Sequence, residues 1–247
     1  MHLSGRVYLV GSGSSGFSLS HDSDCHVYLI DGGAELALID AGAGLGLAQI
    51  LDRIEALGLD KDKISRLFLT HLHADHAGGA AGLKEALPRL KVAVAKEVAQ
   101  VLEAGDEKAI HLDLGKKGGY YAQDYRFRPC PVDLELVEGQ EITVGEIKLR
   151  VVETPGHSAG HLCFLMEDQG LLHLFSGDNL FFGGRILLQP VADCSLADHL
   201  ASLLKLRGLG IEVFLPGHGS FSLRHGQRHV DLALEWLDKC LIPPSFI

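Results

Sequence analysis

The chain has 247 residues, 47% of them hydrophobic, which is enough to bury a substantial core. Its 32 acidic and 22 basic residues give a net charge of -10, which argues against nucleic-acid and membrane partners. No stretch approaches about 18 uncharged apolar residues, and the first residues lack the apolar core of a signal peptide, so we expect a cytoplasmic protein. The five cysteines show no CxxC spacing, which predicts neither a disulfide framework nor a thiolate zinc site.

Short apolar runs at Val7–Val10, Cys25–Ile30 and Ala37–Ile39 predict strands in the first part of the chain. The glycine- and serine-rich segment Gly11–Gly16 lacks the GK[ST] ending of a phosphate loop. We therefore interpret this segment as a connection between strands near the mouth of a site.

Asp40 follows the third of these predicted strands and is itself followed by glycines. It could accept a hydrogen bond from a metal-ligating histidine, or it could cap the next helix. That helix is predicted at Leu47–Leu57, where apolar residues recur at helical spacing, and it should cover a face of a sheet.

The densest group of potential metal ligands follows a predicted strand at Ser65–Thr70. The four donors are His71, His73, Asp75 and His76. A loop at the end of a strand can turn them toward one point, which a regular strand or helix does not allow at this spacing. Imidazole and carboxylate suit zinc, iron or manganese, and so many donors could hold two ions. The alternative is a polar surface loop with incidental histidines.

After this group, helices are predicted at Ala81–Leu87 and Glu97–Glu103 on either side of a strand at Val92–Val94. This alternation of strands and helices predicts α/β layers.

The segment Gly105–Pro131 breaks the alternation and concentrates aromatic residues. It predicts a loop over the active site, in which Tyr120 and Tyr121 are candidate substrate contacts and His111 a candidate polar contact. An excursion held to the core by its own aromatic side chains is an equally good interpretation.

The second part of the chain has predicted strands at Leu134–Val137 and Ile142–Val152, and three strands there each deliver a potential ligand to a tight turn. In chain order, the strands and ligands are Ile142–Val152 with His157, Leu171–Phe175 with Asp178, and Val213–Leu215 with His218. We interpret His161 as a structural residue or a support for a ligand rather than as a ligand.

Four strings, HxHxDH at 71–76, TPGHSAGH at 154–161, SGD at 176–178 and PGHG at 216–219, resemble the metallo-β-lactamase superfamily over nearly the whole chain. The resemblance implies an α/β protein with a four-layer αββα sandwich, formed by residues 1–247 as one domain. It also implies that Asp40 supports the metal loop. It divides the donors into a first site of His71, His73 and His157, a second site of Asp75, His76 and His218, and a bridging Asp178.

Within that superfamily, Asp178 stands where cysteine-using zinc β-lactamases have Cys, which disfavours antibiotic hydrolysis. The motifs are closer to those of glyoxalase II and lactonases. Only 29 residues follow His218, and they are predicted to form one helix at His229–Leu241, which leaves no room there for the glutathione-binding domain of glyoxalase II. The nucleases of the family carry an inserted domain for which we find no space.

These features predict a dinuclear hydrolase with two divalent ions, zinc foremost and iron or manganese as alternatives. A metal-bridging hydroxide would attack a small-molecule thioester, lactone or related ester. Asp75 or Asp178 would accept the proton.

Three alternatives remain open at this point. A persulfide dioxygenase would hold one iron with His71, His157 and Asp178, as the resemblance implies for that subfamily. A phosphodiesterase and a non-catalytic metal-binding protein are the others. A homodimer is a further expectation, based on the frequency of twofold assemblies and on no particular residue.

Overall fold

The first of two sheets in the computed structural model, which describes residues 1–247, has seven strands paired in chain order. They are β1 (His2–Ser4), β2 (Val7–Gly11), β3 (Val27–Asp31), β4 (Leu36–Ile39), β5 (Ile64–Phe68), β6 (Lys91–Ala95) and β7 (Leu134–Leu136). Strands β1 to β4 pair antiparallel, and β4 to β7 pair in parallel. Each parallel pair is joined by a helical connection, as a crossover requires.

The second sheet has five strands in the order β12-β11-β10-β9-β8. They are β8 (Glu141–Val144), β9 (Ile147–Glu153), β10 (Leu162–Asp168), β11 (Leu171–Gly177) and β12 (Ile211–Pro216). The single strand predicted at Ile142–Val152 is wrong, because β8 and β9 form a hairpin there. Its turn contains Gly145 with φ of 55°, where a Cβ would lie 2.0 Å from the Gly32 carbonyl oxygen.

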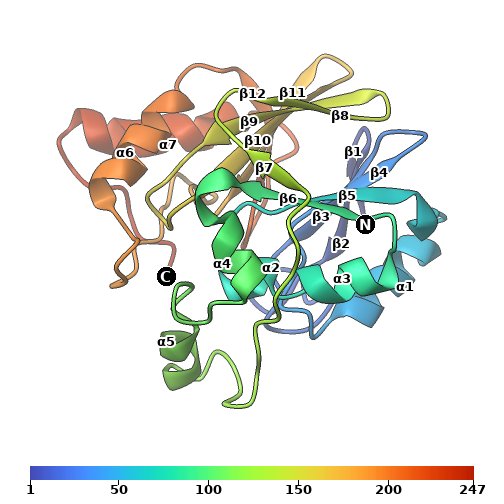
Figure 1. Ribbon diagram of the computed structural model, residues 1–247. Helices are drawn as coiled ribbons and strands as arrows, with labels where there is room; N and C mark the ends of the chain where they lie inside the picture. Colours follow the sequence, from blue (N-terminus) through green and yellow to red (C-terminus); the bar gives the residue numbers. More distant parts are fainter.

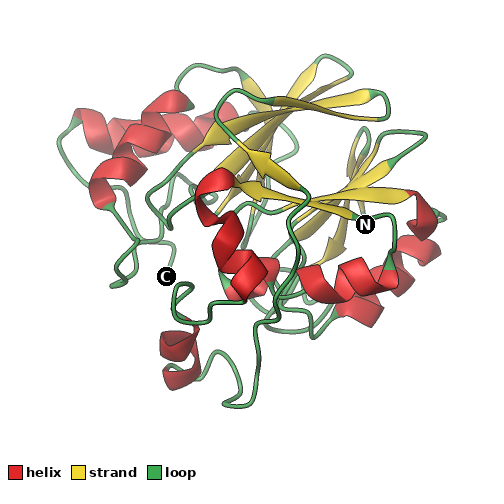
Figure 2. Cartoon of the chain, viewed as in Figure 1, coloured by secondary structure: helices red, strands yellow, loops and turns green.

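Helices cover the outer face of each sheet, so the layers follow the order αββα (Figures 1 and 2). The α-helices are α1 (Leu47–Ala56), α2 (Ala74–Ala77), α3 (Ala80–Ala86), α4 (Ala99–Ala104), α5 (Leu112–Lys117), α6 (Leu196–Lys205) and α7 (Gln227–Asp238). Two 3-10 turns, η1 (Lys61–Lys63) and η2 (Lys96–Val98), precede β5 and α4. None of the helices combines the length and apolar character needed to span a membrane.

Strand β10 of the second sheet is buried on both faces, which explains why it is an almost continuous apolar run. Phe164 and Met166 of β10 pack between the sheets, whereas Cys163 and Leu165 pack in the cluster that includes residues of α6 and α7. Side chains alternate between the faces of a strand, so each neighbour enters a different core. Phe68 of β5 meets Phe164 at a ring-centroid distance of 5.6 Å, which connects the two sheets.

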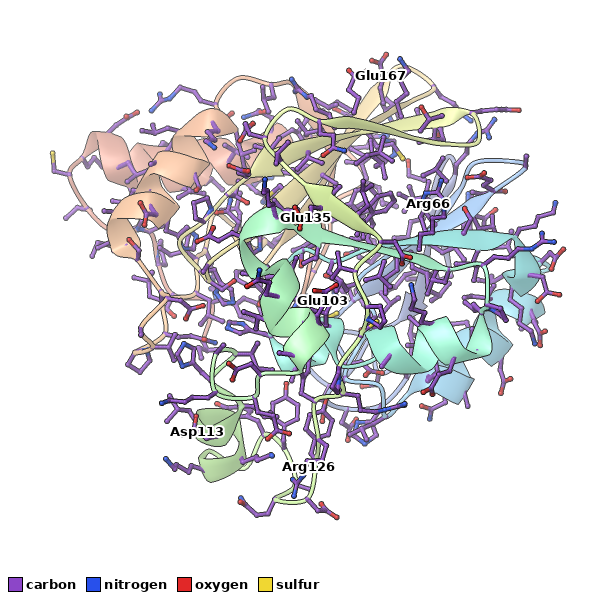
Figure 3. All side chains as sticks on the ribbon, viewed as in Figure 1. Arg66, Glu103, Asp113, Arg126, Glu135 and Glu167 are labelled. Carbon is purple, nitrogen blue, oxygen red and sulfur yellow. The ribbon has the colours of Figure 1, made fainter.

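The predicted loop at Gly105–Pro131 is an excursion that contains the short helix α5. It projects beyond the sheets, where Asp113 and Arg126 mark it in Figure 3. The predicted donors follow β5, β9, β11 and β12, so the ends of both sheets bring them to one side of the sandwich.

Candidate metal centre

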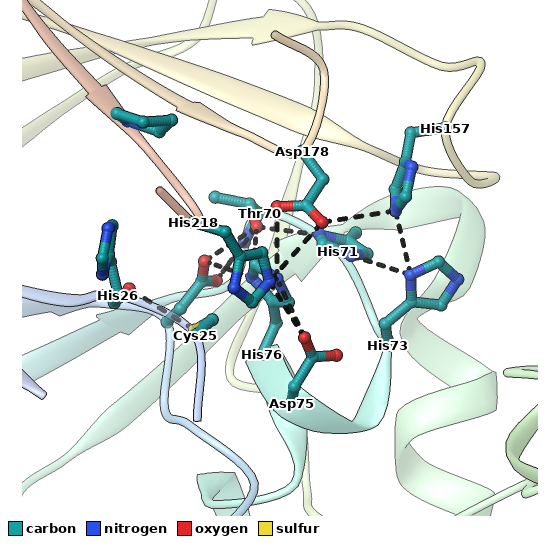
Figure 4. Close-up of polar contacts among 12 residues, drawn as sticks. Cys25, His26, Thr70, His71, His73, Asp75, His76, His157, Asp178 and His218 are labelled. Carbon is teal, nitrogen blue, oxygen red and sulfur yellow. Dashed lines mark hydrogen bonds and ion pairs between the residues drawn. The ribbon is translucent and has the colours of Figure 1, made fainter. Parts of the chain in front are cut away.

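Three histidines form the first group of donors. His73 Nδ1 lies 3.0 Å from His71 Nε2 and also 3.0 Å from His157 Nε2 (Figure 4). His71 and His157 are fully buried. Their nitrogens therefore converge in a place that water does not freely reach, as expected for a metal site.

Outward hydrogen bonds determine which nitrogen of His71 and of His157 faces this group. The His157 Nδ1–H donates to the Leu187 carbonyl oxygen at 3.1 Å. The Thr70 hydroxyl donates to Asp40 and therefore accepts from His71 Nδ1–H, at 3.0 Å. Both Nε2 atoms consequently present lone pairs to the centre of the group. Burial, followed by the neighbouring imidazoles, lowers the pKa of His157 to about 4, which keeps it neutral as a metal ligand requires.

The second group consists of Asp75, His76 and His218. His218 Nε2 lies 3.0 Å from Asp75 Oδ2 and 3.2 Å from His76 Nε2. Although burial lowers the pKa of His218, the carboxylates of Asp178 and Asp75 raise it above its ordinary value. The imidazole of His218 therefore holds a proton more tightly than a free imidazole does, and a divalent cation would compete with that proton.

Asp178 lies between the two groups (Figure 4). Its Oδ2 is 3.6 Å from His157 Nε2, and its Oδ1 is 3.4 Å from His76 Nε2. Oδ1 is buried and has no hydrogen-bond partner. A buried carboxylate oxygen without a partner is costly, and a cation in reach of both groups would remove that cost. The donor set therefore fits divalent metal ions.

Asp40 lies behind the donors and serves both groups. Its Oδ1 accepts from the Thr70 backbone N–H at 2.7 Å, and its Oδ2 accepts from His76 Nδ1–H at 2.8 Å. The residue adopts a φ of 64°, an uncommon conformation that Asp and Asn tolerate best among residues with side chains. This is the position expected of a carboxylate that orients a ligating imidazole.

His161 lies beside the donors, but both of its nitrogens are engaged elsewhere. Its Nε2 accepts from the Asp178 backbone N–H at 3.1 Å, and its Nδ1 is bonded to Thr154 Oγ1 at 2.8 Å. The imidazole therefore holds the Asp178 backbone and directs no free lone pair at the donor groups.

The two tyrosines predicted to contact substrate occupy different environments. The Tyr121 hydroxyl lies 3.4 Å from Asp75 Oδ1, and its ring stacks on Tyr125. The Tyr120 side chain is 72% exposed and makes no hydrogen bond to a donor. His111 pairs with Asp193 at 2.7 Å. Of the two tyrosines, the structure places Tyr121 at the candidate site.

Sequence reasoning missed His26, a fully buried histidine beside His218 with a ring-centroid distance of 6.4 Å. It lies within the apolar run before β3, and its spacing to the other histidines gives no signal. Only its contacts with residues distant in the sequence show that His26 belongs to the surroundings of the site.

The sequence profile of the Metallo-beta-lactamase superfamily matches residues 22–218. This chain belongs to that superfamily. The matched range contains all seven donors, from His71 to His218, and begins just before His26.

Curated relatives in the superfamily include fungal proteins. The chain is 31% identical to the "Atrochrysone carboxyl ACP thioesterase" of Aspergillus fumigatus, over 88% of this chain and 57% of that protein. It is 32% identical to "Lactamase-like protein nscB" of Neosartorya fischeri, over 88% of this chain and 54% of that protein. The chain thus spans about half the length of these relatives.

Solved structures in the superfamily share the fold. BJP-1, a subclass B3 metallo-beta-lactamase of Bradyrhizobium japonicum, gives a TM-score of 0.72 at 24% identity, covering 97% of this chain and 92% of that one. FEZ-1 of Legionella gormanii gives 0.72 at 23% identity, covering 96% and 94%. The predicted αββα metallo-β-lactamase sandwich is confirmed.

Proposed function

We propose that this superfamily member is a dinuclear metal-dependent hydrolase that cleaves a thioester of a small-molecule acyl group. The observation that carries the proposal is the position of the Asp178 carboxylate, which reaches His157 of one donor group and His76 of the other. A bridging carboxylate between two buried donor groups is an arrangement suited to two neighbouring cations.

The residues divide the work between the two groups. His71, His73 and His157 would hold one ion, Asp75, His76 and His218 the other, and Asp178 would contact both. When bound, two divalent ions supply an activated water nucleophile near neutral pH and stabilise negative charge on the carbonyl oxygen. Zinc is the first candidate, and the His/Asp donor set also suits iron or manganese.

Asp75 is the better placed of the two candidate proton acceptors. Its side chain is 24% exposed, whereas the Asp178 side chain is 5% exposed. Burial raises the pKa of Asp75, but the nearby imidazoles of His76 and His218 outweigh burial and hold it below its usual range. The carboxylate is therefore ionised at neutral pH, and its Oδ1 can accept a hydrogen bond from the Tyr121 hydroxyl.

A thioester is the preferred substrate class because the Aspergillus fumigatus relative is named as an acyl carrier protein thioesterase. In thioesters, lactones and activated esters alike, the acyl carbon is bonded to the leaving group through one sulfur or oxygen atom. The same donor arrangement could therefore hydrolyse each of them, with the leaving group determining the relative rate.

The test begins with elemental mass spectrometry of protein purified without added metal or chelator. We expect about two ions per chain, and hydrolysis of an acyl-coenzyme A thioester faster than of a lactone, an aryl ester, bis(p-nitrophenyl) phosphate or a β-lactam. A metal-loaded protein inactive on every substrate would refute the hydrolase and favour a metal-binding protein without catalysis.

A second candidate is a mononuclear-iron persulfide dioxygenase. It is favoured by the buried set of His71, His157 and Asp178, which supplies two imidazoles and one carboxylate, a ligand combination typical of non-haem iron. About one iron per chain, together with oxygen uptake in the presence of glutathione persulfide, would establish this function in place of the hydrolase.

A further inference from the structure

His26 brackets the metal-donor residue His218 by hydrogen bonds to both of its neighbours. The His26 backbone N–H donates to the Gly217 carbonyl oxygen at 2.7 Å. The His26 Nε2–H donates to the Gly219 carbonyl oxygen at 2.9 Å. The two imidazoles do not bond to each other, so His26 acts on the backbone of the turn that carries His218 (Figure 4).

The orientation of the His26 ring is itself fixed. Because Nε2 carries the proton given to Gly219, Nδ1 accepts from the Ser12 hydroxyl at 3.0 Å. Ser12 Oγ in turn accepts from the Phe17 backbone N–H at 2.7 Å. Burial is the largest cause that lowers the pKa of His26, to about 3, so the ring stays neutral and keeps this pattern of one donor and one acceptor.

This network explains the composition of the segment Gly11–Gly16, which the sequence predicted only as a connection between strands near the mouth of a site. A Cβ at Gly16 would lie 2.3 Å from His26 Cε1 and 2.4 Å from Ser12 Oγ, so only glycine lets the segment wrap the imidazole. The Gly219 backbone N–H donates to the Ser15 carbonyl oxygen at 2.8 Å. The Phe17 ring stacks on His26 at 5.5 Å and covers it.

The network connects the two sheets at the second donor group. His218 follows β12 of the second sheet, whereas Asp75 and His76 follow β5 of the first. His26 lies directly before β3 of the first sheet. By holding the His218 turn against the first sheet, it maintains the 3.0 Å separation of His218 Nε2 from Asp75 Oδ2. Prepositioned ligands lose less freedom on binding, which raises affinity.

We propose that His26 is a positioning residue for His218 and that it sets the affinity of the second metal position selectively. The proposal rests on the dinuclear site of the proposed function. Loss of the His26 side chain is expected to weaken the second position about tenfold, at the lower end of the range for residues that support ligands. The first position, formed by His71, His73 and His157, is expected to keep its affinity.

The experiment titrates metal-free protein with Co²⁺ and follows visible absorption and calorimetric heat, so that two binding steps are resolved without any substrate. His26→Leu removes the bond to Gly219, whereas His26→Gln retains an N–H donor in a similar place. His173→Leu is the matched control. Like His26, His173 is buried and hydrogen-bonded, in its case to Leu171 and Ser4. It lies near the start of β11, whereas Asp178 follows the end of that strand.

The expected result is an about tenfold loss confined to one step in His26→Leu, and less than about threefold in His26→Gln. Equal weakening of both steps, or no change in either, would overturn the positioning role. If His26→Leu fails to fold, Ser12→Ala takes its place, since it removes the donor to Nδ1. Selective weakening of one step then supports the proposal, and unchanged steps overturn it.

The wild-type titration separates this proposal from the function on which it depends. Two binding steps in the wild-type protein with no selective change in the variants would refute the role of His26 alone. Binding of only one Co²⁺ per chain in the wild-type protein would refute the dinuclear site and the role of His26 together.

Discussion

The two halves of the molecule supply metal donors in different ways. The first half places His71, His73, Asp75 and His76 within six residues after β5. The second half places one donor after each of β9, β11 and β12. The parallel register that pairs Gly177 with Pro216 is what brings Asp178 and His218 side by side. Local chain geometry thus assembles one half of the site, and strand pairing assembles the other.

The residues that hold the donors in place by hydrogen bonds also differ between the two halves. In the first half, the single carboxylate of Asp40 accepts from Thr70, which bonds to His71, and from His76. In the second half, three separate partners hold the donors: Leu187 for His157, His161 for Asp178 and His26 for His218. Loss of the support shared by the first-half donors should therefore affect both metal positions, and loss of the support of His157 or of His218 should affect one.

Asp178→Ala should have the largest effect, because Asp178 is the second-half residue that contacts both donor groups. We expect loss of at least one ion and a fall in kcat/KM of more than about 100-fold. Substitution of residues that only hydrogen-bond to metal ligands typically costs less than that. Elemental analysis and thioester hydrolysis measure the two effects. Retention of both ions with unchanged turnover would show that the carboxylate does not bridge.

Asp40→Ala tests the single support of the first half. It leaves buried N–H groups of Thr70 and His76 without an acceptor, which should cost about 2–5 kcal/mol of unfolding free energy. Both Co²⁺ binding steps should weaken about 10- to 100-fold. Asp40→Asn keeps an oxygen and tolerates the same φ, so it should lie between Ala and wild type. Weakening of one step alone would contradict the shared role.

Acid should destabilise the metal-free protein through buried neutral histidines in both halves. Burial lowers the pKa of His26 to about 3 and that of His199 to about 4. The unfolded chain binds these protons first, so stability is complete above about pH 6.5 and falls as the pH drops toward 4.

Urea unfolding between pH 7 and pH 4.5 measures this effect. Each such histidine contributes a slope of about 1.4 kcal/mol per pH unit where only the unfolded form is protonated. His26→Gln should remove about one histidine's share of the slope. An identical slope in the variant would mean that His26 is protonated alike in both states.

Tyr121→Phe should have the smallest effect. The hydroxyl contact to Asp75 Oδ1 is long at 3.4 Å, so its loss should lower kcat/KM only about two- to fivefold and leave the metal content unchanged. Tyr120→Phe is the matched control, because that side chain is largely exposed. Equal effects of the two substitutions would place Tyr121 outside the substrate site.

The sequence alone determined much of the first half of the site. The HxHxDH string and the strand before it are local features, and the periodicity of Leu47–Leu57 predicted α1 within one residue. The αββα sandwich was predicted by the resemblance of the four motifs to the metallo-β-lactamase superfamily, whereas the local patterns alone predicted α/β layers and the cluster of four donors. These inferences succeed because donors close in the chain must also be close in space.

Only the tertiary structure decided how the second half meets the first. It divided Ile142–Val152 into a hairpin at Gly145, placed Tyr121 rather than Tyr120 against Asp75, and revealed His26 as the residue that brackets His218. His26 and Gly219 are 193 residues apart in the chain. No local pattern encodes such a contact, because it depends on how the two sheets pack and on the register of β11 against β12.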